Sequence, residues 1–528
     1  MISKSDPDEI QSFLSDASHM RDGKAERVVF PESYGDVAEV LREASASKTP
    51  VTVSGAGTGT VGGRIPFEGI VLATDRLNQI KSIAHKPEGG CAVVEAGVRL
   101  LDFQRFVESE NLFYPPDPTE RSCFLGGNVA TNASGARSFK YGATRNYVRR
   151  LRIALASGDV INLRRGELHA DRTGRIKIPL PSGRSIEARL PSYRMPQTRK
   201  HASGYYVAPQ MDVLDLFIGS EGTLGVIIGI ELALLPKPAG LLSGVVFFKT
   251  DEDVLSFVSE ARRLSLANRK KSPGGLSKLM DKALSVTDRR SPVPALHTDS
   301  PADSILDARA LEYFDVESLK FLRQKYETIP DEAVGAIFFE QETTSATEDL
   351  LMTEWLTLIE RHAALADESW FATGEADQAK LREFRHALPV LMNEWFARHQ
   401  QRKVSTDMSV PDEAFPEMLR FYKETLRASD LRYTIFGHIG DNHVHVNILP
   451  RDANEATKAR AIYVEFLKRA AALGGTLSAE HGIGKLKREY LRLFYSAEHL
   501  REMAALKHAF DPAGILGRGN MFAEEFLS

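Results

Sequence analysis

Three histidines stand within eight residues in the C-terminal half of the chain. The segment Gly437-His-Ile-Gly-Asp-Asn-His-Val-His-Val-Asn places them at His438, His443 and His445. Imidazole nitrogens bind divalent metal ions or carry protons in catalysis. We expect His443 and His445 to share one face of a strand, and the Gly-Asp-Asn turn can fold His438 towards either of them.

A second segment, Ala479-Glu-His-Gly-Ile-Gly, adds Glu480 and His481. Two histidines and one glutamate leave coordination positions open for a substrate, which is the arrangement of a catalytic rather than a structural zinc site. The usual alternative for any single histidine is a satisfied core residue. Because five such groups cluster in a chain with 14 histidines, the sequence favours a metal-dependent active site.

Three glycine-rich segments lie in the N-terminal half. Residues 55–59 follow a β-branched run at 51–53, and their three glycines allow backbone N–H groups to form a nest for phosphate oxygens. Two glycines and a proline at 62–66 prevent the helix that would follow in a Rossmann loop. Residues 126–137 and 217–228 are also rich in small side chains, which leave backbone donors accessible and allow a flat ligand to approach closely. The three loops predict a site for a flat, phosphate-bearing ligand.

The elements that must position these residues follow from periodicity. Over the first 235 residues, short β-branched runs alternate with glycine-rich turns and one helical pattern, which predicts an α+β domain. The expected strands are 51–53, 69–72, 92–96, 151–155 and 225–230, and the expected helix is 36–46. Residues 236–240 are a plausible boundary. A second α+β domain is expected from strands at 244–248 and 335–339 and helices at 251–266, 347–363 and 412–426, with a loop at 289–301.

Composition excludes several classes of protein. The 528 residues carry 67 Lys and Arg against 71 Asp and Glu, a net charge of −4, so the chain is not a globally basic nucleic-acid binder. Two cysteines cannot build a disulfide framework or an iron–sulfur cage. No signal peptide or membrane span is recognisable, so we expect a soluble, cytoplasmic protein. Residues 137–200 hold 16 basic and only 4 acidic residues, which predicts either a solvated basic hairpin or a surface that steers an anionic substrate or acidic redox partner.

The glycine loops resemble the FAD-binding domain of the vanillyl-alcohol oxidase / p-cresol methylhydroxylase type, from about Asp16 to the C-terminus. The resemblance implies an α+β fold, with a two-lobed FAD-binding domain of the p-cresol methylhydroxylase type and an α+β cap domain with an antiparallel sheet. It implies a lead-in at 1–24, the FAD-binding domain at 25–238, and a cap domain with substrate and metal sites at 239–484. Residues 485–528 would then return to the FAD domain.

The same resemblance implies which residues contact FAD. The first glycine loop has no histidine for covalent attachment, and Cys91 and Cys123 lie elsewhere, so the FAD is expected to be non-covalent. The implied FAD-binding residues are Ser54, Gly55, Ala56, Gly57, Thr58, Gly59, Pro118, Gly126, Gly127, Asn128, Thr131, Asn132, Ser134, Gly135, Tyr141, Glu221, Gly222, Gly225 and Ile227.

The C-terminal motifs resemble a metal-dependent branch of this family, which contains D-lactate dehydrogenase, the glycolate oxidase flavin subunit and D-2-hydroxyglutarate dehydrogenase. By position, His438, His445 and Glu480 become metal ligands, with zinc as the expected ion, and His481 becomes the catalytic base. Asn447 becomes a substrate contact. His443 replaces an asparagine of relatives, and it is open whether it is an extra ligand, a hydrogen-bond donor to a ligand, or neither.

Two further residues are implied to bind the substrate. Arg385 matches the arginine that pairs with the substrate carboxylate, with Arg382 as the alternative match, and a rigid guanidinium fork suits that task. Relatives of the hydroxyglutarate type carry a lysine two residues before the aspartate that matches Asp407. Here that position is Ser405, and Lys403 lies two residues further back, which argues against hydroxyglutarate as the substrate.

Taken together, these motifs imply FAD-dependent, metal-assisted oxidation of a D-lactate-like D-2-hydroxy acid to the 2-oxo acid. Electrons would pass to an external quinone, cytochrome or electron-transfer flavoprotein. Residues 510–522 resemble alkylglycerone-phosphate synthase more closely, so a flavin transferase is one alternative, and a non-catalytic flavin-binding subunit is another. A homodimer and a peripheral membrane contact stay open, and no nucleic-acid partner is expected.

Overall fold

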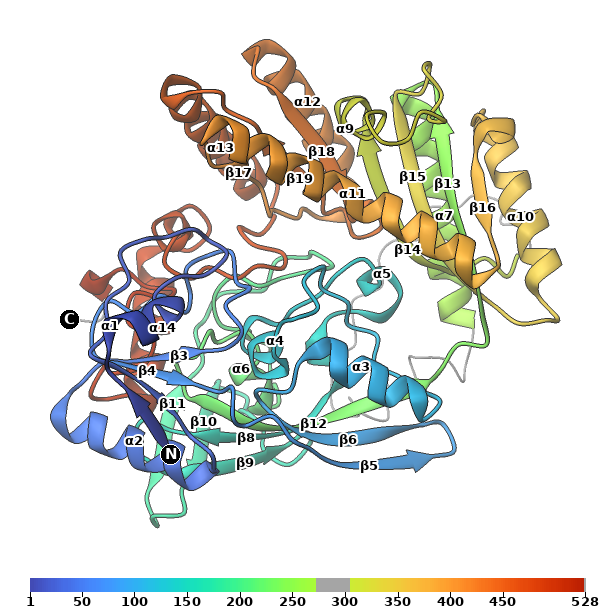
Figure 1. Cartoon of the computed structure of the whole chain (residues 1–528). Coiled ribbons are helices and arrows are strands. Elements are labelled where there is room, and N and C mark those ends of the chain that lie inside the picture. Colours follow the sequence, from blue (N-terminus) through green and yellow to red (C-terminus); the bar gives the residue numbers. More distant parts are fainter. Residues whose placement is uncertain (272–303, 527–528) are drawn as a thin grey trace.

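The computed structural model describes residues 1–271 and 304–526, which form two lobes (Figure 1). The segment predicted as a loop at 289–301 lies outside the described residues. The lower lobe in the figure contains the strands up to β12, and the upper lobe contains those from β13 onwards. The predicted α+β architecture is confirmed.

The first sheet of the lower lobe leads into the first glycine loop, because its strand β3 ends at Ser54. Its strand order is β1-β2-β4-β3, in which β2, β4 and β3 are parallel and β1 is antiparallel to β2. Helix α2 (Tyr34–Ser47) connects β2 to β3, and the Ser33 side chain caps its first turn by accepting a hydrogen bond from Asp36 N. The predicted helix at 36–46 is therefore confirmed. The strands are β1 (Ile2–Lys4), β2 (Arg27–Phe30), β3 (Val51–Ser54) and β4 (Ile70–Ala73).

A second, antiparallel sheet follows the order β5-β6-β12-β8-β9, with β7 paired to β12. Its strands are β5 (Ile80–Lys86), β6 (Gly89–Glu95), β7 (Leu112–Phe113), β8 (Val148–Ala154), β9 (Val160–Arg164) and β12 (Val226–Pro236). A separate hairpin is formed by β10 (Arg175–Pro179) and β11 (Ser185–Arg189). The lobe also contains the helices α1 (Pro7–Ile10), α3 (Leu100–Ser109), α4 (Leu125–Thr131), α5 (Ser138–Tyr141) and α6 (Leu214–Phe217).

The upper lobe is built on one antiparallel sheet of order β16-β13-β15-β14-β18-β19-β17, which confirms the predicted cap sheet. Its strands are β13 (Gly240–Phe248), β14 (Ala308–Asp315), β15 (Gly335–Thr343), β16 (Trp370–Ala372), β17 (Val404–Ser405), β18 (Tyr433–Gly437) and β19 (His445–Ile448). Its helices are α7 (Asp251–Lys271), α9 (Val316–Leu322), α10 (Glu348–Arg361), α11 (Glu375–His399), α12 (Phe415–Ser429) and α13 (Ala453–Ala472). The helix predicted from residue 412 begins instead at Phe415, after a 3₁₀ turn.

Helices cover both faces of the upper sheet, because alternate residues of a strand point to opposite faces. On β13, Val246 and Phe248 join the core that contains Trp355 of α10. Val245 and Phe247 join a separate core with α11, which crosses the front of the sheet in Figure 1. The sheet that contains β18 and β19 is thus packed between helices on both faces.

The C-terminal segment, which includes α14 (Ala497–Phe510), lies in the lower lobe. Val51 N donates a hydrogen bond of 2.8 Å to Ile515 O, and Lys507 Nζ donates one of 3.0 Å to Thr223 O. These contacts pack the end of the chain against β3 and the third glycine loop. Among the described helices, none combines the length and apolar character needed to cross a membrane.

Candidate active site

The three glycine-rich loops meet in the lower lobe. Gly219 N donates a hydrogen bond of 3.0 Å to Val129 O, and Glu221 N donates one of 2.8 Å to Ala130 O. A Cβ on Gly222 would lie 3.7 Å from Val53, at the end of β3. Sequence segments that are far apart therefore form one continuous surface.

This surface fits an FAD. A Cβ built on Gly59 or Gly127 would meet no atom within 4 Å, so both glycines face open space. The side-chain nitrogen Nδ2 of Asn128 is buried and has no hydrogen-bond partner among the described residues. As predicted, no helix follows β3 directly. Open space beside an unpaired donor is what a bound cofactor with polar edges requires.

Other predicted FAD-binding residues also make contacts within the protein. Both carboxylate oxygens of Glu221 accept 2.7 Å hydrogen bonds, from Ile483 N and Gly484 N. The hydroxyl of Tyr141 donates to Glu342 of the upper sheet. A Cβ on Gly225 would collide with Ile153, 2.6 Å away. At these positions, hydrogen bonds within the protein (Glu221 and Tyr141) or close packing (Gly225) already account for the residue type.

The remaining predicted FAD-binding residues lie on the same loops and on α4. Ser54 ends β3, Gly126 and Thr131 lie on α4, and Asn132 ends that helix with φ +51°. A Cβ on Gly135 would clash with the carbonyl of Asp117, next to Pro118. The structure thus brings the predicted set together along β3, α4 and the loop that precedes β12.

The predicted metal ligands converge at the edge of the upper sheet. His438 follows β18, His445 begins β19, and Glu480 lies in the loop after α13. His443 joins them, and one ligand atom from each of the four lies within 4.8 Å of every other. Two imidazoles and a carboxylate suit Zn²⁺ and similar ions, so these residues fit the expected metal.

The turn between β18 and β19 brings the histidines together. Asn442 adopts a left-handed conformation with φ +53°, which reverses the chain before His443. Because β19 begins at His445, the prediction that His443 shares its strand was wrong. The ring centroids of His443 and His445 nevertheless lie 4.5 Å apart.

Each predicted histidine ligand is anchored through its far nitrogen. His438 Nδ1 lies 2.6 Å from Glu312 Oε1, and His445 Nδ1 lies 3.0 Å from Thr406 O. Their Nε2 atoms lie 3.3 Å and 3.9 Å from Glu480 Oε2. A carboxylate or carbonyl on the far nitrogen is the usual support of a metal-binding histidine, because it fixes the tautomer and the ring orientation.

Burial and neighbouring charge set the protonation of this cluster. Burial, reinforced by His443 and His481, holds the pKa of His445 well below its usual value, which keeps the imidazole neutral. For His438, burial is outweighed by Glu312 and Glu480, and its pKa is raised to about 9. Without a metal ion, His438 therefore carries a proton that a bound ion would displace.

The two oxygens of Glu480 have different environments. Oε1 accepts hydrogen bonds from Ser134 Oγ, at 2.8 Å, and from Lys200 Nζ. Oε2 faces His438 and His445. Burial disfavours the charge, but His438 and Lys200 hold the pKa of this carboxyl well below its usual range. Glu480 thus presents one anionic oxygen to the centre of the cluster.

His481 lies beside the cluster and is 37% exposed. Its Nδ1 lies 3.3 Å from Asp407 Oδ2, and its ring is nearly parallel to that of His445, with centroids 5.5 Å apart. Asp407 also accepts hydrogen bonds from the backbone N–H groups of Glu480 and His481, and from Lys487 Nζ. Despite burial, His481 and Lys487 hold the pKa of Asp407 well below its usual value.

The predicted substrate-binding residues are distributed around this cluster. Arg385 Nε lies 3.3 Å from Glu312 Oε2, so it contacts the carboxylate that anchors His438. Asn447 is buried and lies two residues after His445 on β19, on the same face of the strand. Lys403 is exposed, immediately before β17.

Sequence reasoning missed the functional contacts of Glu312, Asp407 and Lys200. Glu312 is a charged residue in the otherwise apolar centre of β14, and that contrast was an available signal. In the sequence, Asp407 stands out only as the position that relatives of the hydroxyglutarate type precede by a lysine. Lys200 lies in the basic segment 137–200, and nothing local in the sequence distinguishes it.

Part of that basic segment is neutralised between the two lobes. Lys140 Nζ lies 3.0 Å from Asp307 and 2.9 Å from Glu342, and Arg199 Nε lies 3.1 Å from Asp441. These ion pairs help to fix the upper lobe over the FAD loops.

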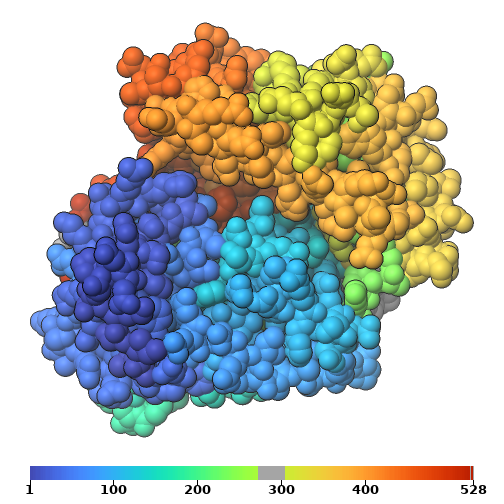
Figure 2. Space-filling view, in the orientation of Figure 1, coloured from blue at the N-terminus to red at the C-terminus, as the bar shows by residue number. Residues whose placement is uncertain are grey.

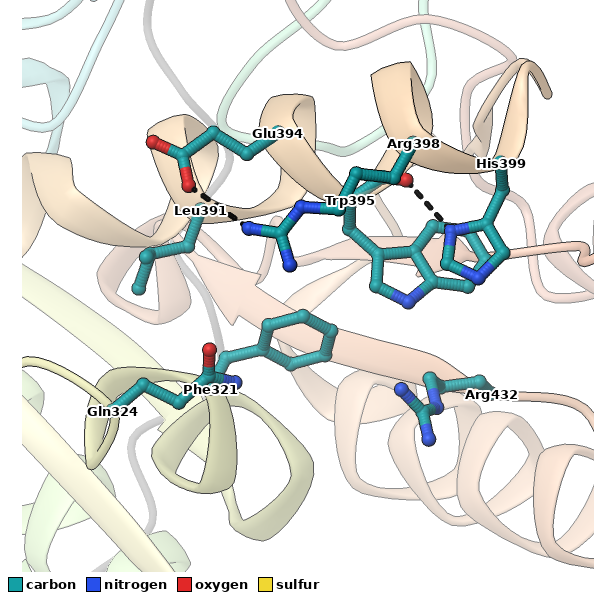
Figure 3. A pocket seen from close by; sticks show the side chains of 8 residues that line it. All are labelled: Phe321, Gln324, Leu391, Glu394, Trp395, Arg398, His399 and Arg432. Atoms are coloured by element: carbon teal, nitrogen blue, oxygen red, sulfur yellow. Dashed lines mark hydrogen bonds and ion pairs between the residues drawn. The ribbon is translucent and has the colours of Figure 1, made fainter.

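The surface is hollowed between the two lobes (Figure 2). A different cavity, of about 290 Å³, lies on α9 and α11 and is drawn in Figure 3. Its lining contains no predicted site residue and consists of Phe321, Gln324, Leu391, Glu394, Trp395, Arg398, His399 and Arg432. The predicted FAD-binding, metal-binding and substrate-binding residues therefore lie elsewhere, and this cavity is not part of the candidate active site.

A two-lobed α+β fold with converging glycine loops and a histidine–carboxylate cluster at the edge of an antiparallel cap sheet defines a class of flavoprotein oxidoreductases. Comparison with known proteins gives the same class. Residues 25–164 match the family described as FAD binding domain, and residues 301–521 match the family described as FAD linked oxidases, C-terminal domain. The chain thus combines an FAD-binding domain with the C-terminal domain of the FAD-linked oxidases, and FAD is the cofactor that these domains support.

Curated relatives are similar over nearly their whole length. The glycolate oxidase subunit GlcD of Bacillus subtilis (strain 168) is 29% identical over 97% of this chain and 92% of its own. The D-lactate dehydrogenase of Anaerostipes hadrus is 29% identical over 94% and 90%. The D-2-hydroxyglutarate dehydrogenase of Stutzerimonas stutzeri (strain A1501) is 27% identical over 94% and 90%.

A solved structure of alkyldihydroxyacetonephosphate synthase shares the fold. It is 14% identical, with a TM-score of 0.61 over 98% of this chain and 81% of its own. At this identity the likeness concerns the fold alone.

Proposed function

We propose that the protein oxidises a D-2-hydroxy acid to the 2-oxo acid. The observation that carries this proposal is the position of the cluster of His438, His445 and Glu480, next to His481 and hydrogen-bonded to Ser134 of the FAD loops. The relatives named D-lactate dehydrogenase and glycolate oxidase subunit support the same substrate class.

The proposed cofactors are non-covalent FAD and one divalent metal ion, with zinc as the first choice. When bound, FAD would accept a hydride from the substrate α-carbon and the metal would lower the pKa of the substrate hydroxyl. The predicted loop residues would hold FAD, and His438, His445 and Glu480 would hold the metal.

The remaining roles belong to the chain's own side chains. His481 would take the hydroxyl proton, and Asp407 would orient its ring and stabilise the resulting imidazolium. Arg385 would bind the substrate carboxylate, while Glu312 holds the guanidinium in place. Asn447 would add a further polar contact, and exposed Lys403 would contact the far end of a longer substrate.

We also propose that the chain is divided as predicted, with boundaries near residues 24, 238 and 484. The second boundary is supported by the end of β12 at Pro236 and the start of β13 at Gly240. The last is supported by the contacts of the C-terminal segment with β3. An external electron acceptor would receive the electrons from the reduced protein.

The test is a panel of D-2-hydroxy acids and their L-enantiomers, assayed with a dye acceptor with and without added Zn²⁺, Mn²⁺ or Co²⁺. We expect dye reduction with at least one short D-2-hydroxy acid, at a rate that falls on chelation. A transferase of the alkyldihydroxyacetonephosphate synthase type, or a non-catalytic subunit, would reduce no dye. That outcome on the whole panel would reject the proposal.

A further inference from the structure

We infer that His443 is a fourth protein ligand of the metal ion and binds through Nδ1. The inference rests on the proposed metal site and extends it, because the residues expected from the family are only His438, His445 and Glu480. If it is correct, the ion is held by three imidazoles and one carboxylate.

The first argument is the hydrogen bonding of His443. Its side chain is completely buried, and neither ring nitrogen makes a hydrogen bond with any described residue. An unpartnered buried polar group costs about 1–3 kcal/mol. The Asp407 carboxylate, 3.2 Å from Nε2, can compensate only that nitrogen, so a histidine that only filled the core would still carry this cost at Nδ1. A metal ion on Nδ1 would remove it.

The second argument is the orientation of the ring. Nε2 lies 3.2 Å from Asp407 Oδ1, and Nδ1, on the other side of the ring, lies 4.0 Å from Glu480 Oε1. His438 likewise lies between two carboxylates, with Nδ1 2.6 Å from Glu312 and Nε2 3.3 Å from the other Glu480 oxygen, Oε2. A carboxylate behind the imidazole is the usual support of a metal ligand. A small ring rotation would complete the hydrogen bond from Nε2 to Asp407.

The third argument is the availability of the Nδ1 lone pair. With the proton on Nε2 facing the Asp407 carboxylate, Nδ1 keeps its lone pair. Ligand atoms around a tetrahedral zinc ion lie about 3.3 Å apart, given bonds of about 2.0–2.1 Å. The atoms of the cluster, all within 4.8 Å, need only small side-chain movements to reach that geometry.

A third imidazole has a consequence for metal choice. Imidazole suits Zn²⁺, Co²⁺ and Ni²⁺, whereas Mn²⁺ prefers oxygen ligands. We therefore expect the protein to bind Zn²⁺ and Co²⁺ far more tightly than Mn²⁺. Substrate would then add to a four-ligand ion by raising its coordination number, as catalytic zinc sites do when they expand to five ligands.

The experiment compares the wild type with His443→Asn, in protein that retains FAD and has been freed of metal by dialysis against a chelator. Asparagine keeps a polar group of similar reach but replaces the imidazole with a weakly ligating amide. His362→Asn is the matched control, because His362 is a largely buried histidine of the same lobe whose Nε2 lies 2.7 Å from the Glu260 carboxylate.

Two readouts independent of turnover are used. Zn²⁺ affinity is measured by competition with a chromophoric chelator, and Co²⁺ binding is followed by its visible absorption. Loss of a partner behind a ligand costs about 10–100-fold in affinity. Loss of a ligand should cost at least the upper end of that range, so we expect His443→Asn to bind Zn²⁺ at least about 100-fold more weakly and to show an altered Co²⁺ spectrum. His362→Asn should match the wild type.

A measurement on the wild type alone covers the case in which His443→Asn does not fold. In the Co²⁺ protein, each coordinated imidazole gives one strongly shifted, exchangeable N–H proton resonance. Three such resonances support the inference, and two contradict it. Unchanged Zn²⁺ affinity and Co²⁺ spectrum in folded His443→Asn would overturn the role of His443 and leave the three-ligand site standing. An active wild type that binds no metal would overturn both the role of His443 and the proposed metal site.

Discussion

Ser134 Oγ donates a hydrogen bond of 2.8 Å to Glu480 Oε1 and so joins two residues that are 346 positions apart. Ser134 belongs to the loop that is predicted to contact FAD, and Glu480 belongs to the proposed metal site. Lys200 donates to the same oxygen and to the carbonyl of Gly135, at 3.1 Å. The two proposed cofactor sites therefore share one hydrogen-bonded group, which fixes the Glu480 carboxylate relative to the loop predicted to contact FAD.

The first prediction concerns the attachment of FAD. No histidine lies in the loop at 55–59, and burial raises the pKa of the nearby Cys123 thiol to about 12, so that thiol is not a nucleophile. We expect acid precipitation of the yellow protein to release all the colour into the supernatant. A pellet that stays yellow after washing would contradict a non-covalent FAD.

The second prediction concerns metal and turnover together. Removal of one protein ligand exposes the ion to water and leaves the other ligands misaligned, so His438→Ala and Glu480→Ala should each lose bound metal and at least about 100-fold in kcat. Metal is counted by elemental analysis on the same samples that are assayed. His362→Ala, in the same lobe, should keep both. A metal-free Glu480→Ala that turns over normally would remove the metal from the mechanism.

The third prediction separates His481 from the metal ligands. A general base contributes about 10²–10⁴-fold to the rate, so His481→Asn should lower kcat by that factor. Its FAD content and metal content should stay near the wild-type values, because the ring contacts Asp407 and projects beside the cluster. His508→Asn, on the exposed side of α14, is the control. Loss of metal in His481→Asn would mean that the roles of residues 480 and 481 are exchanged.

The fourth prediction concerns Glu312, which contacts both His438 and Arg385. Glu312→Gln keeps the shape of the side chain but removes the charge that fixes the His438 tautomer. We expect Zn²⁺ affinity to fall about 10–100-fold, measured by chelator competition. KM for the hydroxy acid should rise as well, because the Arg385 guanidinium loses its partner. Unchanged Zn²⁺ affinity and unchanged KM would show that Glu312 only balances buried charge and supports neither the metal site nor substrate binding.

The fold was predictable wherever sequence periodicity determines it. Strands such as β3 and β13 and helix α2 follow from local patterns of apolar residues, and the glycine loops follow from their composition. The cluster was predictable only in part. His438 and His445 lie in one short motif, but Glu312, which contacts His438, comes from a strand that is 126 residues earlier in the sequence. Partners that meet only through tertiary packing, such as Ser134 and Glu480, leave no local signal.

The position of His443 was also not predictable from the local sequence pattern. Alternation along a strand predicts that it shares a face with His445, but the left-handed Asn442 places it in the turn before β19. The two rings still meet, although for a different reason. The position of a side chain at the end of a strand thus depends on a single backbone conformation that composition does not specify.

The fifth prediction concerns Asp315 and the pH dependence of stability. Asp315 caps α9, and its Oδ1 accepts hydrogen bonds from Ser318 N and Ile435 N, at 2.8 and 3.0 Å. Burial raises its pKa from 3.8 to about 6, against the opposing effect of these bonds. Because the folded-state pKa lies above the unfolded one, the favourable contribution is complete below about pH 4. It is lost as the pH rises through about 6, and the loss is about 3 kcal/mol.

Asp315→Asn should remove this pH dependence. Asparagine keeps Oδ1 as an acceptor and is a good capping residue, but it carries no charge to bury. The free energy of unfolding of Asp315→Asn relative to wild type should therefore rise between pH 4 and 6 and then stay constant. Urea unfolding midpoints of both proteins at several pH values measure this difference, with Asp452→Asn, at the exposed start of α13, as the control for loss of a capping charge. A difference that is the same at pH 4 and pH 7 would show that the Asp315 carboxyl is not the titrating group.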